Sequence, residues 1–447
     1  MEEFVQKNIM PPVMKLVNTK AIQAMKDGMI YTIPLIIAGS IFLILGQLPV
    51  QSWADAVSSV QIGDMTLTDL FLKANGSSFS INAIIAVVAI AYMYIKNEGY
   101  EPLGGAFVAL ASFLMISPAS VTGATESGEE LVIGNVIDKG WTGGKAMIGS
   151  IIVGLLVGLA YSAILKKDIR IKMPAGVPEG VANAFTALIP AILILTCTMI
   201  IEGIIHIASK QTGMELIYTV IGAPLQSLAD SYPAILLCSF LVHFLWFFGV
   251  HGATLISGIM TPMWTANYME NQAIFEANGE VTRALGGHIV TQQFYENMIT
   301  ITGSGITIGI AIYCLAFAKS AQYKALGGIA IGPACFNINE PIIFGIPIVM
   351  NPIAAVPFML VPMISCTMEY FAIWSGLCPM YRGIYVPWTT PPIISGFLIG
   401  GVRTAILQAL VLVMSVVVYT PFMRMLDKQA LENEQNASTA DDDDDDW

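Results

Sequence analysis

Long apolar runs separated by short polar segments extend over most of this chain. A run of about 20 apolar residues crosses a bilayer as a helix, so each run predicts a membrane-spanning segment. The runs lie at residues 28–48, 81–96, 103–123, 146–165, 185–206, 232–250, 305–318, 353–377 and 393–420. Glycine and proline inside the runs are compatible with spans, because neighbouring helices satisfy the backbone groups that these residues free. The pattern therefore predicts an all-α polytopic membrane protein.

The polar segments between the runs predict how the chain is oriented. Residues 1–27 carry four lysines among apolar residues, which is typical of an amphipathic helix on the membrane surface. The loop 166–182 carries four further basic residues, whereas residues 49–80 carry a single lysine. Since basic residues concentrate on the cytoplasmic side, we expect the N-terminus and the 166–182 loop to be cytoplasmic.

The regular pattern breaks down after residue 250. Residues 292–309 are semi-polar around a Gly-Ser-Gly turn, and residues 332–352 contain four prolines, which one straight helix cannot accommodate. Non-helical backbone at membrane depth persists only where protein buries it or where it lines a water-filled cavity. Two interrupted segments of this kind indicate a transporter's binding site, and ordinary extramembrane loops are the alternative.

This contrast predicts the domain organisation. The first half has regular spans suited to a scaffold, and the second half has broken, polar segments suited to a binding site. The predicted parts are an amphipathic N-terminal helix at 1–27, a scaffold and dimerisation domain at 28–206, an amphipathic linker at 207–230, a transport domain at 231–423 and a disordered acidic tail at 424–447.

Composition agrees with a membrane protein and excludes other classes. Only 12% of the 447 residues are charged, against the roughly 25% that is usual for a soluble domain. The 20 Lys and Arg residues do not outnumber the 32 Asp and Glu residues, so no basic surface for nucleic acid is expected. Residues 424–447 hold nine acidic and two basic residues, so this stretch, which we expect to be solvated on the cytoplasmic side, supplies −7 of the net charge of −12. The six cysteines are expected to be buried thiols, and no nucleotide-binding or zinc motif is present, so we expect neither a metal nor a cofactor.

The proline-broken stretch contains the strongest candidate for chemistry. Glu340 lies between Asn339 and Pro341, with Asn337 close by, so a carboxylate and two amides converge on interrupted backbone. Such groups suit hydroxyl recognition, because a carboxylate accepts hydrogen bonds and amides both donate and accept them. His251 ends another run between glycines that leave room for a ligand. An ordinary histidine at the membrane interface is the alternative for that residue.

Aromatic residues of the second half add a second clue. Sugars present C–H faces that stack on indole rings, while their hydroxyls need polar partners. Trp388 lies in a Pro- and Thr-rich stretch that predicts a loop, so we assign it to the site. Trp374 ends an apolar run and fits the aromatic belt at the membrane interface instead.

A few further ionisable groups lie inside the runs. Glu202 and His206 are four residues apart on one helix face, and we expect them to pair with each other. Glu369 and Arg403 are candidates for structural ion partners, including of each other.

These motifs resemble a known family of membrane proteins. The stretches MKLVNTKAIQAMKDGMIYTIPLIIAGSIFLIL, FFGVHG, FNINEPIIFGIPIVMNP and VPWTTPP are similar to the membrane-embedded EIIC component of bacterial sugar phosphotransferase systems. Among these components, the motifs most resemble those of the lactose, cellobiose and diacetylchitobiose family. The resemblance extends over residues 1–423, and the NEPIIFG-type motif is its most specific part.

The resemblance implies an architecture and a partner. It implies a homodimer in the bacterial cytoplasmic membrane with ten transmembrane helices, two re-entrant hairpins, both termini in the cytoplasm and an elevator motion of the second half. Each protomer would bind one disaccharide. A separate EIIB subunit, supplied through EIIA and HPr, would transfer a phosphoryl group from its cysteine to the sugar's 6-hydroxyl. No EIIB-like domain is recognisable in the chain, so by itself it would be a transporter subunit and not an enzyme.

The resemblance also implies roles for particular residues. By position, Glu340 and His251 match the family's polar pair at the hydroxyl to be phosphorylated. Asn339 would add hydrogen bonds, and Trp388 and Trp246 would complete the sugar site. The residues alone leave two alternatives open: an ion-coupled secondary sugar transporter, and an integral-membrane enzyme acting on lipid-linked sugar.

Overall fold

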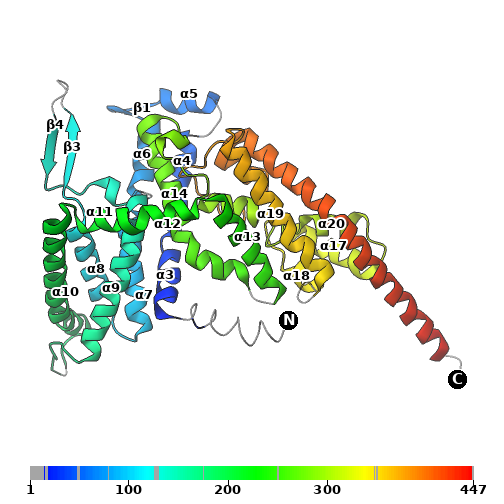
Figure 1. Ribbon diagram of the computed structural model, residues 1–447, viewed down its shortest axis with the longest axis horizontal. Helices are drawn as coiled ribbons and strands as arrows, with labels where there is room; N and C mark the ends of the chain where they lie inside the picture. Colours follow the sequence, from blue (N-terminus) through cyan, green and yellow to red (C-terminus); the bar gives the residue numbers. More distant parts are fainter. Residues whose placement is uncertain are drawn as a thin grey trace. The chain divides into compact units, whose positions relative to one another are not determined.

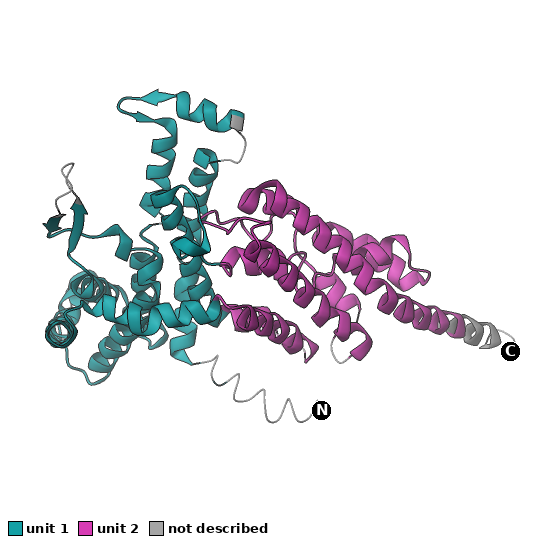
Figure 2. Cartoon of the chain, turned by 45° about the horizontal axis from the view of Figure 1, so that its top comes forward, with its two compact units in different colours: residues 1–229, 258–288 teal, residues 230–257, 289–447 magenta. Residues whose placement is uncertain are grey.

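The computed structural model describes most of the chain, in two compact units. The first unit comprises Met1–Ala229 and Gly258–His288, and the second comprises Asp230–Ser257 and Ile289–Trp447 (Figure 2). The predicted amphipathic helix at 1–27 lies largely outside the described residues. The described residues are 15, 19–47, 51–78, 80–124, 130–174, 176–248, 251–346, 348 and 351–444.

The first unit consists mainly of helices (Figure 1). The short helix that begins at Gly213 has a capping box: Thr212 accepts from the backbone N–H of Glu215, and Glu215 accepts from that of Thr212. The helices are α3 (Lys20–Ile30), α4 (Ile33–Gln47), α5 (Gln51–Ser59), α6 (Leu67–Ser78), α7 (Asn82–Asn97), α8 (Leu103–Ile116), α9 (Met147–Lys166), α10 (Glu179–Ser209), α11 (Gly213–Ile217), α12 (Ala223–Ala229) and most of α14 (Gly252–Asn278). Single turns η2 (Lys139–Trp141), η3 (Gly144–Ala146), η4 (Tyr218–Gly222) and η5 (Arg283–Leu285) link them.

The core of this unit depends on small residues between helices. A Cβ added at Gly154 of α9 would lie 3.1 Å from Ile90 of α7, and one at Gly158 would lie 2.9 Å from Tyr94. The two helices therefore pack at a distance that larger side chains would prevent, as is common in membrane proteins.

Two short antiparallel hairpins depart from the all-α prediction. One pairs β1 (Gln61–Ile62) with β2 (Met65–Thr66), and the other pairs β3 (Ser120–Ala124) with β4 (Glu130–Gly134). The second hairpin also corrects the predicted span at 103–123, because α8 ends at Ile116 and Pro118 follows. Val121 and Thr122 beyond that proline are β-branched and pair with Ile133 and Val132.

The second unit holds the interrupted part of the chain. Helix α20 is bent at Gly401, whose φ of 70° lies in the left-handed region. Its elements are α13 (Tyr232–Phe247), the first turns of α14, α15 (Gln292–Phe294), the π-helical turn η6 (Tyr295–Ile299), α16 (Ile308–Ala316), α17 (Ala321–Ala334), α18 (Glu340–Gly345), α19 (Pro352–Trp374) and α20 (Ile394–Asp444).

Six helices of the described residues are long and apolar enough to cross a membrane. They are Lys20–Gln47, Leu67–Asn97, Gly144–Lys166, Glu179–Ser209, Pro352–Trp374 and Ile394–Asn436, and each overlaps a predicted run. Three predicted runs give shorter helices: α8 has 14 residues, α13 has 16 and α16 has nine. The run at 305–318 is therefore no simple span, because the backbone before Thr307 turns sharply.

The boundaries of the units differ from the predicted domains in two places. Residues 258–288, predicted within the transport domain, belong to the first unit. The tail at 424–447, predicted to be disordered, continues α20 as far as Asp444. Helix-forming residues and the pair of Lys428 with Glu432 (3.6 Å) favour this helix locally. Carboxylates of the same stretch bind backbone groups more than 100 residues away, which the local sequence does not reveal.

Candidate functional site

The two interrupted segments predicted from the sequence meet in the second unit. The Asn337 Oδ1 atom accepts a hydrogen bond from the backbone N–H of Thr302 at 2.6 Å. The Asn339 side chain donates to the carbonyl oxygen of Ser304 at 2.6 Å and to the Thr307 hydroxyl at 3.0 Å. The turn before α16 and the turn before α18 are therefore joined by two asparagine side chains.

Both turns contain residues in the left-handed backbone region. Thr302 and Ile306 have φ angles of 58° and 52°, and Asn337 has a φ of 64°. Such conformations cost on the order of 1–3 kcal/mol each and persist where the surroundings impose them, often at binding sites. Gly303 has a φ of 90°, and an added Cβ would lie 2.2 Å from the Asn339 side chain. Only glycine fits there, so the asparagine can approach the turn closely.

A third segment, between α19 and α20, joins the same arrangement. The Asn337 amide also donates to the carbonyl oxygens of Trp388 and, at 2.9 Å, of Thr390. On the other side of this loop, the backbone N–H of Val386 donates to Gln293 Oε1 at 3.0 Å. The Trp388 loop is thus held from two sides.

The predicted site residues differ in how free their side chains are. Asn337 and Asn339 are buried, at 8% and 5% exposure, and their amides bind the protein itself. Glu340 is exposed at the start of α18, directly after these asparagines, and Trp388 is 53% exposed. The asparagines therefore hold the frame, and the carboxylate and the indole are available to a ligand.

His251 and Trp246 form a separate pair in this unit. Their ring centroids lie 4.6 Å apart, with Trp246 buried and His251 exposed. The backbone N–H of Thr254 donates to His251 Nδ1 at 3.3 Å, so Nδ1 is the acceptor and Nε2 carries the proton of the neutral ring. Among the residues that the structure describes, no hydrogen bond or ring contact joins this pair to Glu340 or Trp388.

Several polar residues of the buried frame were not singled out from the sequence. Glu296 accepts hydrogen bonds from Gln292 and, at 3.3 Å, from the Tyr385 hydroxyl. Gln408, fully buried in α20, accepts from the backbone of Ile393 and Gly396 and donates to the carbonyl oxygen of Asn297 at 2.9 Å. The available signal was the density of amides and acids at 292–297 beside strongly apolar residues.

His243 is a second omission. It is fully buried in α13, and its Nδ1 atom lies 2.6 Å from the carbonyl oxygen of Ser239. Because a carbonyl oxygen only accepts, Nδ1 carries the proton. A histidine inside an apolar run was the sequence signal for this residue.

The other ionisable candidates, Glu202, Glu369 and Arg403, lie in different surroundings. Glu202 accepts from the backbone N–H of Gly213 at 2.9 Å and so caps α11. Glu369 is fully buried with the Tyr381 hydroxyl as a neighbour, whereas Arg403 is exposed. Within the described ranges, no group of three or more His, Cys, Asp or Glu side chains could hold a metal ion.

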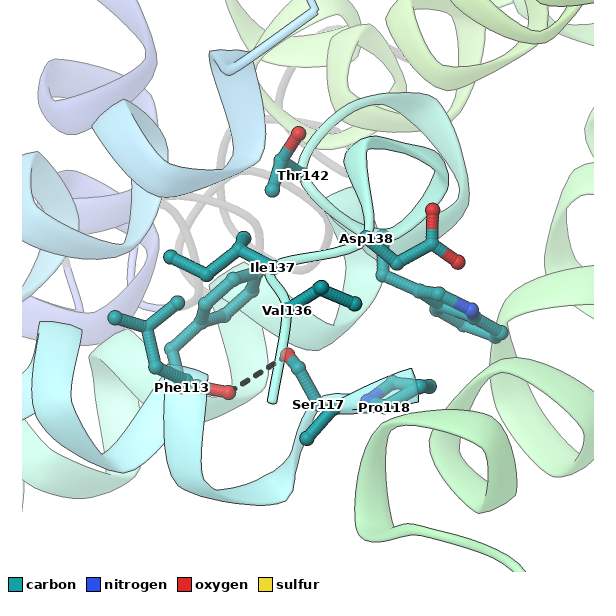
Figure 3. Close-up of a pocket in the computed structure, with 10 residues that line it drawn as sticks. Phe113, Ser117, Pro118, Val136, Ile137, Asp138 and Thr142 are labelled. Carbon is teal, nitrogen blue, oxygen red and sulfur yellow. Dashed lines mark hydrogen bonds between the residues drawn. The ribbon is translucent and has the colours of Figure 1, made fainter. Parts of the chain in front are cut away.

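A small pocket of about 40 Å³ lies elsewhere, at the base of the β3–β4 hairpin of the first unit (Figure 3). Its polar groups are occupied by local bonds: the Ser117 hydroxyl donates to the carbonyl oxygen of Phe113 at 2.8 Å, and Asp138 accepts from the backbone N–H of Gly140 at 2.8 Å. The remaining lining is mostly apolar, and the pocket contains none of the predicted site residues. The candidate site is therefore the framework of turns in the second unit.

Comparison with known proteins agrees with the motifs. The family model described as Phosphotransferase system, EIIC matches residues 26–362. The lichenan permease IIC component of Bacillus subtilis strain 168 is 35% identical over 440 residues, which cover 97% of this chain and 95% of that protein. The cellobiose-specific EIIC component of Geobacillus stearothermophilus is 34% identical over 441 residues, covering 97% of each.

A solved structure shares the fold over nearly the whole chain. It is the crystal structure of the transporter ChbC, the IIC component from the N,N'-diacetylchitobiose-specific phosphotransferase system. The two structures align with a TM-score of 0.90 at 32% identity, covering 97% of this chain and 99% of that one. The family model, the relatives and the shared fold agree: this chain belongs to the EIIC family, the multi-pass membrane transport components of the phosphotransferase system.

Proposed function

We propose that this protein is the permease of a disaccharide phosphotransferase system, with a substrate of the cellobiose, diacetylchitobiose or lactose type. The observation that carries the proposal is the exposed pair of Glu340 and Trp388 on turns that buried asparagines bind together. The names of the relatives support the substrate class, since they include cellobiose- and lactose-specific components.

The available groups match the chemistry of a neutral sugar. Glu340 would accept hydrogen bonds from sugar hydroxyls, and the proton on His251 Nε2 would be donated to a sugar oxygen. Trp388 would stack on the C–H face of a ring, with Trp246 behind His251. Asn339 contributes through the frame, because its amide nitrogen already donates to Ser304 and Thr307.

The reaction would then be completed by a partner. After the sugar crosses the membrane, Glu340 and His251 would hold its 6-hydroxyl. A separate EIIB subunit, which receives its phosphoryl group through EIIA and HPr, would transfer that group to the hydroxyl. Phosphorylation adds about two negative charges, so the exposed carboxylate of Glu340 would repel the product and favour its release.

The assembly belongs to the same proposal. Helix α10 has 31 residues and is apolar and mostly exposed, with Ile200 and Ile204 at 52% and 60%. Such a helix needs lipid or a second copy of the chain around it, and we assign to it part of a homodimer scaffold formed by residues 28–206. Ten transmembrane helices, two re-entrant hairpins and an elevator movement of the second half, with both termini cytoplasmic, complete the proposed transporter.

Transport in vesicles tests this function against an ion-coupled sugar transporter. Uptake of labelled cellobiose, diacetylchitobiose and lactose is measured with phosphorylated EIIB inside the vesicles, or with an inward proton or sodium gradient and no phosphoryl donor. We expect one of the sugars to accumulate as its phosphate only when EIIB is phosphorylated. Accumulation of free sugar driven by the ion gradient would contradict the proposal.

A further inference from the structure

The C-terminal part of α20 binds the beginning of α17 through a buried carboxylate. Asp427, at 3% exposure, accepts from the backbone N–H groups of Lys319 at 2.8 Å and Ser320 at 3.0 Å. It also accepts from the Ser320 hydroxyl at 2.7 Å and from the Tyr313 hydroxyl at 3.4 Å. Two of these donors are main-chain groups, so the contact fixes the backbone of the tip between α16 and α17.

A second carboxylate, two helical turns further along α20, continues the contact. Glu434 accepts from the backbone N–H of Ala321 at 3.0 Å and of Gln322 at 2.9 Å. The Ser320 hydroxyl accepts from the N–H of Tyr323 at 3.4 Å. The first N–H groups of a helix have no partner inside the helix, and here α20 and Ser320 supply one for each. Negative charge at this end also complements the helix dipole.

The far end of the same helix leads into the candidate site. Helix α17 has 14 residues, so it spans about 20 Å between the tip and the asparagine turn. Beyond Ala334 come Asn337, Asn339 and then Glu340, the exposed carboxylate of the site. Figure 1 shows α17 beside α20 and α18 next to it. A displacement of the tip would therefore move a rigid helix that ends at the site.

We propose that Asp427 and Glu434 are positioning residues for sugar binding: they lock the α16–α17 hairpin to α20 and so fix the place of Glu340. The inference rests on the proposed role of Glu340 as the sugar ligand. It gives a function to the acidic residues at 424–436, which lie far along the chain from the substrate site. Glu432, on another side of α20, is exposed and forms an ion pair with Lys428 at 3.6 Å.

The test compares Asp427→Asn, Glu434→Gln and the double variant with Glu432→Gln, in the full-length protein. Hydrogen exchange at the backbone amides of 319–323 reports the contact with α20. The Kd of sugar binding and the maximal rate of sugar transport report the effect of that contact on the site. We expect exchange at 321–322 to rise about tenfold in Glu434→Gln and at 319–320 in Asp427→Asn, since hydrogen bonds to charged groups are lost. We expect Kd to rise several-fold with little change in the maximal rate, and Glu432→Gln to match the wild type. Asp427→Glu, which keeps the carboxylate, should recover part of the affinity.

Two results would overturn the proposal. Unchanged exchange in Glu434→Gln would show that the contact with α17 is absent. Faster exchange together with a wild-type Kd for the sugar would show that the contact does not position the site. Glu434 is only partly buried, so this variant keeps the test valid if Asp427→Asn does not fold. Glu340→Gln, measured alongside, separates a failure of the positioning role from a failure of the proposed function. If its affinity is lost while the tail variants bind normally, the proposed function stands and the positioning role fails.

Discussion

Asparagine and glutamate have different tasks in the NINEP stretch. The amides of Asn337 and Asn339 bind backbone groups of turns that lie 35 to 53 residues away, whereas Glu340 next to them is exposed. The sequence predicted that these three side chains converge. It could not show that the asparagines bind the protein, because their partners are distant in the chain.

Asn337 is the residue whose substitution tests the frame. In Asn337→Asp, a carboxylate would face the carbonyl oxygens of Trp388 and Thr390, and both would lose their donor. Buried groups left without partners cost about 1–3 kcal/mol each, so we expect the free energy of unfolding to fall by about 2 kcal/mol or more. Thermal unfolding in detergent measures the loss. Asn433→Asp makes the same change at an exposed position and should leave the melting temperature unchanged.

At the level of elements, the turn before α16 shows why glycine and strain occur together. Thr302 and Ile306 hold left-handed backbone that β-branched residues rarely adopt, and the neighbouring glycines make room for Asn339 and Phe358. The sequence showed the Gly-Ser-Gly pattern and the interruption. It did not show the strain, which depends on contacts made only in the folded unit.

Gly303→Ala should therefore be damaging. The new Cβ would lie 2.2 Å from Asn339, and alanine at a φ of 90° is strained, so we expect a loss of at least about 1 kcal/mol and weaker sugar binding. Gly328→Ala in α17 is the matched control, because nothing lies within 4 Å of its added Cβ. That change should stabilise the helix by about 0.5–1 kcal/mol. Equal stability of the two variants would contradict this account of the turn.

Other elements show the limits of periodicity. The apolar runs correctly predicted six long helices, since helix-forming runs of about 20 residues carry a strong local signal. The β3–β4 hairpin was missed because the first strand, with Val121, continues the apolar run of α8, and only Pro118 marks the end of that helix. The helical tail was missed because Asp427 and Glu434 have partners at 319–322.

At the level of the whole molecule, the exposed apolar side chains of α10 require a partner subunit or lipid around them. In a dimer, side chains such as Ile200 and Ile204 would contact the partner subunit. We expect the detergent-solubilised protein to have twice the 48.0 kDa chain mass by light scattering, and Ile200→Arg with Ile204→Arg to shift it towards the monomer. Leu410→Arg, an exposed position of α20, should remain dimeric. A wild-type monomer would contradict the proposed assembly.

The central claim is that Glu340 binds the sugar, and calorimetric titration of the purified protein tests it most directly. Cellobiose, diacetylchitobiose and lactose are titrated into the wild type, Glu340→Gln and the control Glu432→Gln. The account predicts saturable binding of at least one disaccharide, a loss of at least about tenfold in affinity in Glu340→Gln, and wild-type affinity in the control. Equal affinity of Glu340→Gln and the wild type would contradict it.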